Sequence, residues 1–159
     1  MDLKGAYAFT QALESKISEV GMESYILEGI RSPQIGDTLR VLMPVTAEGH
    51  PVIAEFMLTE LADDYHLLIL YTTVLASIKA NKDKLPATLI DWNLACPMGH
   101  YGVYEEENQL YHKYSLPFPV DADPGLLAAQ AMDLLTLVYE LLSAKYPDFL
   151  EFTGKDDTP

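Results

Sequence analysis

Histidine and cysteine are the side chains of this sequence that could act as nucleophiles, bases or metal ligands. The chain has four histidines, His50, His66, His100 and His112, and one cysteine, Cys96. No two histidines stand four residues apart and none lies in a cysteine cluster, so the spacing predicts no metal site and no cofactor. His66 and His112 alternate with apolar residues, which indicates sheet histidines whose polar atoms are satisfied within the fold.

Cys96 and His100 are close enough in sequence to suggest a thiol–imidazole pair, which would activate the sulfur for nucleophilic attack. Pro97 and Gly99 interrupt any helix between them, and no Asn or Asp is placed to orient the imidazole. Free cysteine more often serves as a small buried hydrophobic residue. The sequence also has no glycine-rich phosphate loop and no nucleophile elbow. We therefore predict that the protein is not an enzyme, with a thiol hydrolase using Cys96 as an alternative.

Acidic and aromatic residues offer two further candidates. Successive side chains of a strand point to opposite sides, so the run 105–107 of three glutamates predicts a hydrated hairpin tip rather than a cation site. Five of the ten tyrosines are Tyr65, Tyr71, Tyr101, Tyr104 and Tyr111. Tyrosine combines a large contact area with a polar tip, so these could line a recognition surface, although half-buried sheet positions explain them equally well.

The charge balance excludes whole classes of partner. The chain has 24 acidic and 10 basic side chains, a formal net charge of -14 and a pI near 4.4. Such a field repels phosphate backbones and anionic lipid headgroups, so we expect neither nucleic acid nor a membrane as partner. The length of 159 residues predicts one domain over 1–150 and a polar tail over 151–159. A single cysteine and no signal-peptide pattern predict a cytoplasmic protein.

The first half of the chain reads as a helix followed by strands. Apolar residues every three or four positions predict a helix over 3–20, closed by Gly21. Alternating patterns predict strands over 39–45, 52–58 and 65–74, with a turn at 48–51 between the first two. The short loops between them require an antiparallel meander. The pattern allows an additional short strand over 25–30.

The second half predicts a short helix, a hairpin and a long helix. Pro86 suits the first turn of a helix that ends at 95, before Pro97. Strands over 101–104 and 109–118 form the hairpin. Asp123 caps a final helix over 124–146, which Pro147 should stop, and the chain should fray from residue 148. The expected fold is α+β, with about five antiparallel strands and helices packed on them, in the order α-β-β-β-α-β-β-α.

The final helix is unusually apolar, with a narrow polar stripe. One sheet face cannot cover so wide an apolar surface, so either another part of the fold or a partner chain should contact it. The residues predicted for a partner or dimer surface are Trp92, Leu127, Leu134, Val138 and Leu141.

Several segments together resemble a known superfamily. They are the run Ile90-Asp91-Trp92-Asn93-Leu94, the hairpin over 99–116 with its acidic tip, the capped final helix and the ending Lys145-Tyr146-Pro147-Asp148-Phe149-Leu150. This progression resembles the type III secretion chaperone-like superfamily, and is most similar to its YbjN-type branch of putative sensory transduction regulators. The resemblance implies a cytoplasmic homodimer that binds a segment of a client protein without catalysis.

The predicted function is therefore a non-catalytic protein-binding module, chaperone-like or regulatory, that holds a partner segment on an apolar surface. The alternative is a regulatory domain that senses a small ligand in a pocket between the sheet and the final helix, which the Tyr and Met content suggests.

Overall fold

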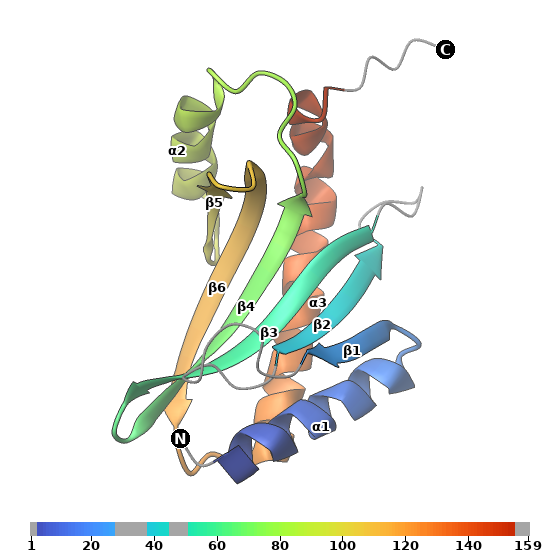
Figure 1. Cartoon of the computed structure of the whole chain (residues 1–159), viewed down its shortest axis with the longest axis vertical. Coiled ribbons are helices and arrows are strands. Elements are labelled where there is room, and N and C mark those ends of the chain that lie inside the picture. The colour runs from blue at the N-terminus through green and yellow to red at the C-terminus, as the bar shows by residue number, and fades with distance from the viewer. Residues whose placement is uncertain (1–2, 28–37, 45–50, 155–159) are drawn as a thin grey trace.

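The computed structural model describes residues 3–27, 38–44 and 51–154 of the chain (Figure 1). Its elements are α1 (Leu3–Glu19), β1 (Glu23–Leu27), β2 (Thr38–Pro44), β3 (Pro51–Ala62), β4 (Tyr65–Leu75), α2 (Leu85–Ala95), β5 (His100–Tyr104), β6 (Gln109–Pro119), α3 (Pro124–Phe149) and a short 3-10 helix, η1 (Leu150–Phe152). This order confirms the predicted α+β class.

The strands form one antiparallel sheet with the order β1-β2-β3-β4-β6-β5. The meander β2-β3-β4 and the hairpin β5-β6 are both present, because short connections leave neighbouring strands no other pairing. The sheet has six strands rather than about five, because the additional strand exists as β1 and pairs with β2. Residues 28–30 of that expected strand, and most of the turn expected at 48–51, lie outside the described residues.

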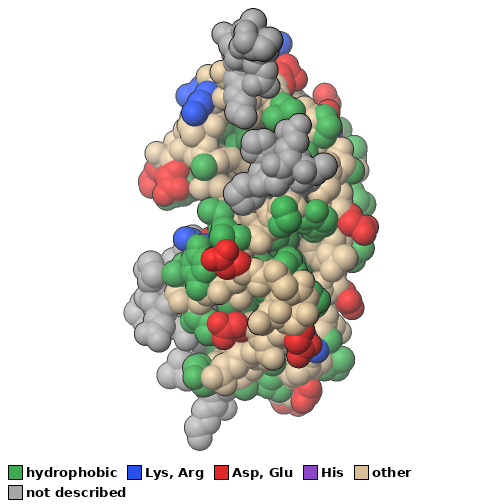
Figure 2. Space-filling model, turned by 90° about the vertical axis from the view of Figure 1, so that its right-hand side faces the viewer, with side chains coloured by type: hydrophobic (Ala, Val, Ile, Leu, Met, Phe, Trp, Pro, Cys, Tyr) green, Lys and Arg blue, Asp and Glu red, His purple; other side chains and the backbone are tan. Residues whose placement is uncertain are grey.

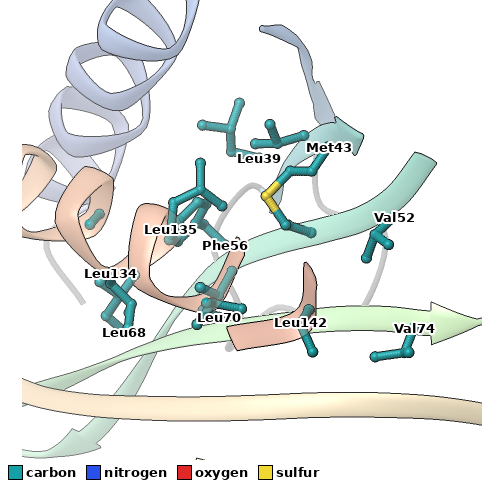
Figure 3. Close-up of a cluster of buried hydrophobic side chains, with 14 of the residues drawn as sticks. Leu39, Met43, Val52, Phe56, Leu68, Leu70, Val74, Leu134, Leu135 and Leu142 are labelled. Carbon is teal, nitrogen blue, oxygen red and sulfur yellow. The ribbon is translucent and has the colours of Figure 1, made fainter. Parts of the chain in front are cut away.

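The hydrophobic core lies between one face of the sheet and the helices α1 and α3 (Figures 1 and 3). Alternate residues of β4 from His66 to Val74 are buried on this face, and the residues between them are half-buried on the other. In the close-up, Leu134 of α3 lies beside Leu68 of β4. The period-two pattern of the sequence thus assigns each strand residue to its face.

Helix α1 crosses the N-terminal part of α3 and packs against it (Figure 1). Its buried stripe has the predicted spacing of three or four residues and consists of Ala6, Phe9, Leu13 and Ile17. Gly21, at φ 75°, closes the helix, with its N–H donating to the Ser18 carbonyl oxygen. The second surface expected to contact the apolar final helix is thus supplied by α1 of the same chain.

The end of α3 differs from the prediction. Asp123 caps the helix, accepting a hydrogen bond of 2.8 Å from the Leu126 N–H, but the helix continues through Pro147. Phe149 and Phe152 beyond it are fully buried, and their rings meet Trp92 edge-on at 5.4 and 5.7 Å. These aromatic anchors hold residues 148–152 against the body, so the fraying expected from residue 148 is absent here.

Asn93 of α2 forms hydrogen bonds with the outer edge of β5, which is an edge strand of the sheet. Its side-chain oxygen accepts a hydrogen bond of 2.6 Å from the Tyr101 N–H, and its amide nitrogen donates one of 2.9 Å to the Tyr101 carbonyl oxygen. The side chain thus occupies both backbone groups that a further strand would need at this residue.

Candidate functional site

The residues predicted for a partner surface contribute little surface to the single chain. Trp92, Leu127, Leu134 and Val138 are each at most 8% exposed, and Leu141 is half-buried. The physical reason is that the buried α3 side chains lie on the side of the helix that packs against α1 and the sheet, while the aromatic anchors contact Trp92. Contact of a partner with α3 stays a prediction, and the large apolar side chains of α3 that are exposed are Leu126 and Leu137.

The segment Pro124–Phe152 is long and apolar enough, by length and composition, to cross a membrane. Core helices of soluble proteins can have the same composition. In this structure the helix buries eight side chains of α3, among them Leu135 and Leu142, in the core of the domain. Its apolar character is thus used in packing against the sheet and α1.

Helix α2 is apolar on its outer side as well as its inner side. Trp92 points into the core, whereas Ile90 and Leu94 are 63% and 82% exposed. These two residues stand four positions apart, so they are neighbours on one side of the helix. A shallow groove here is lined by Leu89, Ile90, Asn93, Leu94 and Tyr101. We refer to Leu89, Ile90 and Leu94 as the α2 outer face.

The structure places Cys96 beside His112 rather than His100. The Cys96 Sγ atom lies 3.9 Å from His112 Nε2. His100 is exposed, and its ring contacts Tyr111 at 6.2 Å. His112 is fully buried, and this burial lowers its pKa more than the hydrogen bond to the Met98 backbone raises it. The imidazole is therefore neutral at pH 7.

The hydrogen bonds of this pair leave the thiol unactivated. The carbonyl oxygen of Met98 accepts one from the Cys96 thiol, at 3.0 Å, and one from His112 Nε2, at 2.9 Å. A ring nitrogen that faces a carbonyl must carry the hydrogen, so Nε2 is not a base for the neighbouring thiol. Among the residues that the structure describes, no group of three His, Cys, Asp or Glu side chains could hold a metal ion.

The sheet face opposite α1 and α3 carries a polar hollow, which sequence reasoning did not predict. It is lined by Arg40, Ile53, Glu55, Tyr71, Thr73, Ala76, Tyr104, Glu107 and Gln109, and we refer to it as the sheet-face hollow. Figure 2 shows the molecule from the side, and the sheet face that Figure 1 presents to the viewer is on its left. The molecular outline has a notch on this left side. No local motif marks the hollow, because its residues come from five strands, from the residue that follows β4 and from the turn between β5 and β6.

An ion pair between neighbouring strands lies in the sheet-face hollow. Arg40 of β2 stands opposite Glu55 of β3, and its Nη2 and Nε atoms donate to Glu55 Oε1 at 2.7 and 3.0 Å. Glu55 is only 2% exposed. Hydrogen bonding to Glu55 is the main cause that raises the pKa of Arg40, so the guanidinium keeps its charge beside the buried carboxylate.

A single antiparallel sheet with two helices on one face and a polar hollow on the other defines an α+β domain built around one core. Residues 34–151, well over half of the chain, match the family model YbjN, described as "Putative bacterial sensory transduction regulator". The chain therefore belongs to the YbjN family, as the resemblance in sequence predicted. No curated protein and no solved structure matches it.

Proposed function

We propose that the protein is a regulator that holds a segment of another protein on the α2 outer face, without catalysing a reaction. The observation that carries this proposal is the pair Ile90 and Leu94, 63% and 82% exposed on a helix that Trp92 fastens to the core. Adjacent exposed apolar side chains on a rigid element suit the anchoring of a partner. Membership of a family described as regulators supports the same role.

The α2 outer face suits a short segment better than a second copy of the chain. Its three side chains are far fewer than the roughly 20–30 residues a side of a stable protein interface. A segment with apolar anchors and basic flanks would also complement the formal net charge of -14. The same charge disfavours nucleic acid and anionic lipid. The homodimer that the resemblance implies would need a larger surface and stays a prediction.

The proposed setting is the cytoplasm. The cysteine, Cys96, is free, and its thiol is engaged with a backbone carbonyl oxygen, which suits a reducing compartment. Fractionation of the native host, with detection of the untagged chain by antibody, tests this setting, and recovery from the periplasm or medium would contradict it.

The decisive experiment places a photo-crosslinking amino acid at position 87 of the tagged full chain in its native host, because Ala87 is exposed one helical turn before Ile90 and is not an anchor. Mass spectrometry then identifies the crosslinked segment, and a synthetic peptide of that segment is titrated against the purified chain. We expect saturable binding that weakens at least about tenfold in the double variant Ile90→Ser/Leu94→Ser, because two central anchors are lost.

The matched control is the double variant Leu126→Ser/Leu137→Ser, which removes two comparably exposed leucines from α3. It should bind the peptide like the native chain, and circular dichroism should show that both double variants are folded. The proposal is overturned if the α2 double variant binds the peptide as tightly as the α3 double variant does. It is also overturned if the crosslinks join only two copies of this chain and light scattering gives twice the monomer mass.

A second candidate function is the sensing of a small ligand, and the sheet-face hollow favours it. Small-molecule sites are concave and combine apolar or aromatic walls with a few polar groups that orient the ligand, and the hollow offers Tyr71 and Tyr104 beside Arg40 and Glu107. The pocket expected between the sheet and the final helix lies on the other side of the sheet, where Leu116 and Phe118 of β6 face Leu126, Leu127 and Gln130 of α3 across a second hollow. A thermal-shift screen of metabolites tests this function, and a variant Arg40→Gln serves to map any hit to the hollow.

A further inference from the structure

One wall of the sheet-face hollow is a chain of hydrogen bonds that ends in a carboxylate. The Tyr71 hydroxyl donates to Gln109 Oε1 at 2.7 Å, and Gln109 Nε2 donates to Glu107 Oε2 at 3.3 Å. The three side chains come from β4, β6 and the turn between β5 and β6. Each bond fixes the orientation of the next group, so the Glu107 carboxylate is held at the rim of the hollow.

The same wall is aromatic and supported from behind. Tyr71 stacks on Tyr111 of β6, with ring centroids 4.9 Å apart and an interplanar angle of 29°. Tyr111 in turn lies over Gly102 of β5, where a Cβ atom would be 2.5 Å from the tyrosine ring, so glycine makes room for it. At the outer edge Tyr104 is 43% exposed. Tyr71 thus supplies a ring that stacking holds in place, and Tyr104 supplies a ring that is accessible to solvent.

The balance of charge in the hollow favours cations. The positive charge of Arg40 is already opposed by Glu55, at 2.7 Å. Glu107 forms no ion pair with any residue that the structure describes, and Glu105 and Glu106 precede it in the same exposed turn. The formal net charge of the whole chain, -14, acts in the same direction. An anionic ligand would meet repulsion here, whereas a cation would gain from both the carboxylate and the aromatic faces.

We propose that the sheet-face hollow binds a small organic ammonium compound, with its cationic head against the faces of Tyr71 and Tyr104 and within reach of Glu107. Carboxylates and electron-rich ring faces attract such a head together, and the ring faces distinguish it from a strongly hydrated metal ion. This inference rests on the second candidate function, ligand sensing, and is independent of the α2 outer face.

The test compares choline with its uncharged isostere 3,3-dimethylbutan-1-ol, which has the same shape without the charge. Each is titrated into the isotopically labelled full chain at constant ionic strength, and amide signals are followed by NMR. We expect choline to give saturable shifts at Tyr71, Tyr104 and Gln109, and the isostere to give none. Equal effects of both compounds would overturn the ammonium class while leaving ligand sensing standing, and saturable shifts confined to other residues would overturn the site.

Two matched variants separate specific binding from general attraction. Glu107→Gln removes the rim carboxylate and should weaken choline binding about fivefold, whereas Glu105→Gln, in the same turn but outside the hollow, should change it by less than about twofold. Tyr104→Ala removes an exposed ring and should weaken binding without unfolding the chain. Equal weakening by the two glutamate variants would show attraction to the acidic turn alone and overturn the proposal.

Discussion

The imidazole of His112 is fully buried, and burial lowers its pKa from the ordinary value of 6.5. Below about pH 6.5 the unfolded chain therefore takes up a proton at this residue that the folded chain does not bind. The free energy of unfolding should fall as the pH drops through this range. Between pH 6.5 and 5.5 we expect His112 to contribute a loss of up to about 1 kcal/mol, measured by urea denaturation.

The variant His112→Gln isolates this contribution from that of the other titrating groups. It should lack the added loss of stability below pH 6.5, whatever its stability at neutral pH. His100→Gln supplies the control, and should keep most of the loss below pH 6.5, because burial and not the charge of His100 is the largest cause of the lowered pKa of His112. Identical pH dependence in the native chain and in His112→Gln would contradict the prediction.

The chemistry of single residues could be predicted only in part. The alternation of His112 with Leu110 indicated a buried sheet histidine with satisfied polar atoms, and the structure confirms its burial and the hydrogen bond of Nε2. The expectation was wrong for Nδ1, which is buried without a hydrogen-bond partner among the described residues. Cys96 was paired in sequence with His100, four residues away, yet its spatial neighbour is His112, which stands sixteen residues away on another element. Proximity in the sequence does not determine which imidazole lies beside the thiol. The pairing of β6 with β5 brings His112, rather than His100, next to Cys96.

At the scale of elements, η1 fastens the end of α3 to the segment that precedes α2. The carbonyl oxygen of Phe152 accepts hydrogen bonds from the N–H groups of Lys79 and Ala80, at 2.9 and 3.3 Å, and its buried ring meets Trp92. We expect Phe152→Ala to lower the free energy of unfolding by about 3–5 kcal/mol, because it leaves a cavity beside Trp92 in the core. Urea denaturation monitored by tryptophan fluorescence measures this directly.

Leu150 provides the matched control, since it lies two residues away in η1 and is 44% exposed. Leu150→Ala should cost less than about 1 kcal/mol. If the two variants lose the same small amount of stability, then the chain frays after residue 148, as the polar composition of its end first indicated.

The elements were predictable where a local pattern and a local cap agreed. The stripe of α1 and the cap at Asp123 each specify a helix boundary within a few residues. The prediction that Pro147 ends the final helix was wrong. A proline usually ends a helix, but here the burial of Phe149 and Phe152 offsets the cost of the proline. Such compensation depends on side chains of α2 and β5, more than forty positions away in the sequence, so local patterns do not show it.

The whole molecule carries 24 acidic and 10 basic side chains. Exposed ion pairs such as Lys84 with Glu151, at 3.5 Å, offset little of the repulsion between so many carboxylates. Salt screens this repulsion, so we expect the melting temperature to rise when NaCl increases from about 20 to 300 mM. Each kcal/mol gained corresponds to about 2–4 °C for a chain of this size. Differential scanning calorimetry measures the change.

A matched series in choline chloride at the same ionic strength separates screening from binding. Screening alone gives equal rises in the two salts, and occupation of the sheet-face hollow adds a further rise in choline chloride. A melting temperature that falls with added NaCl would show instead that favourable ion pairs outweigh the repulsion.

The assembly of the whole molecule was less predictable than its parts. The composition of α3 showed that two surfaces must contact it, but it could not show whether the second belonged to the same chain, and the apolar stripe of α1 fits either arrangement. The sheet-face hollow was unpredictable for a related reason. Arg40, Tyr71 and Glu107 come together only through the register of the sheet and its turn, and no sequence spacing encodes that register.

The hydrogen bonds of Asn93 to Tyr101 also bear on how this sheet could extend between molecules. Fibrous growth by strand addition needs two open ends, one to receive each new copy and one to offer to the next. With both backbone groups of Tyr101 engaged by an amide side chain, strand addition at the β5 edge would leave that residue unpaired with the incoming copy. A single asparagine therefore disfavours polymerisation through this edge of the sheet.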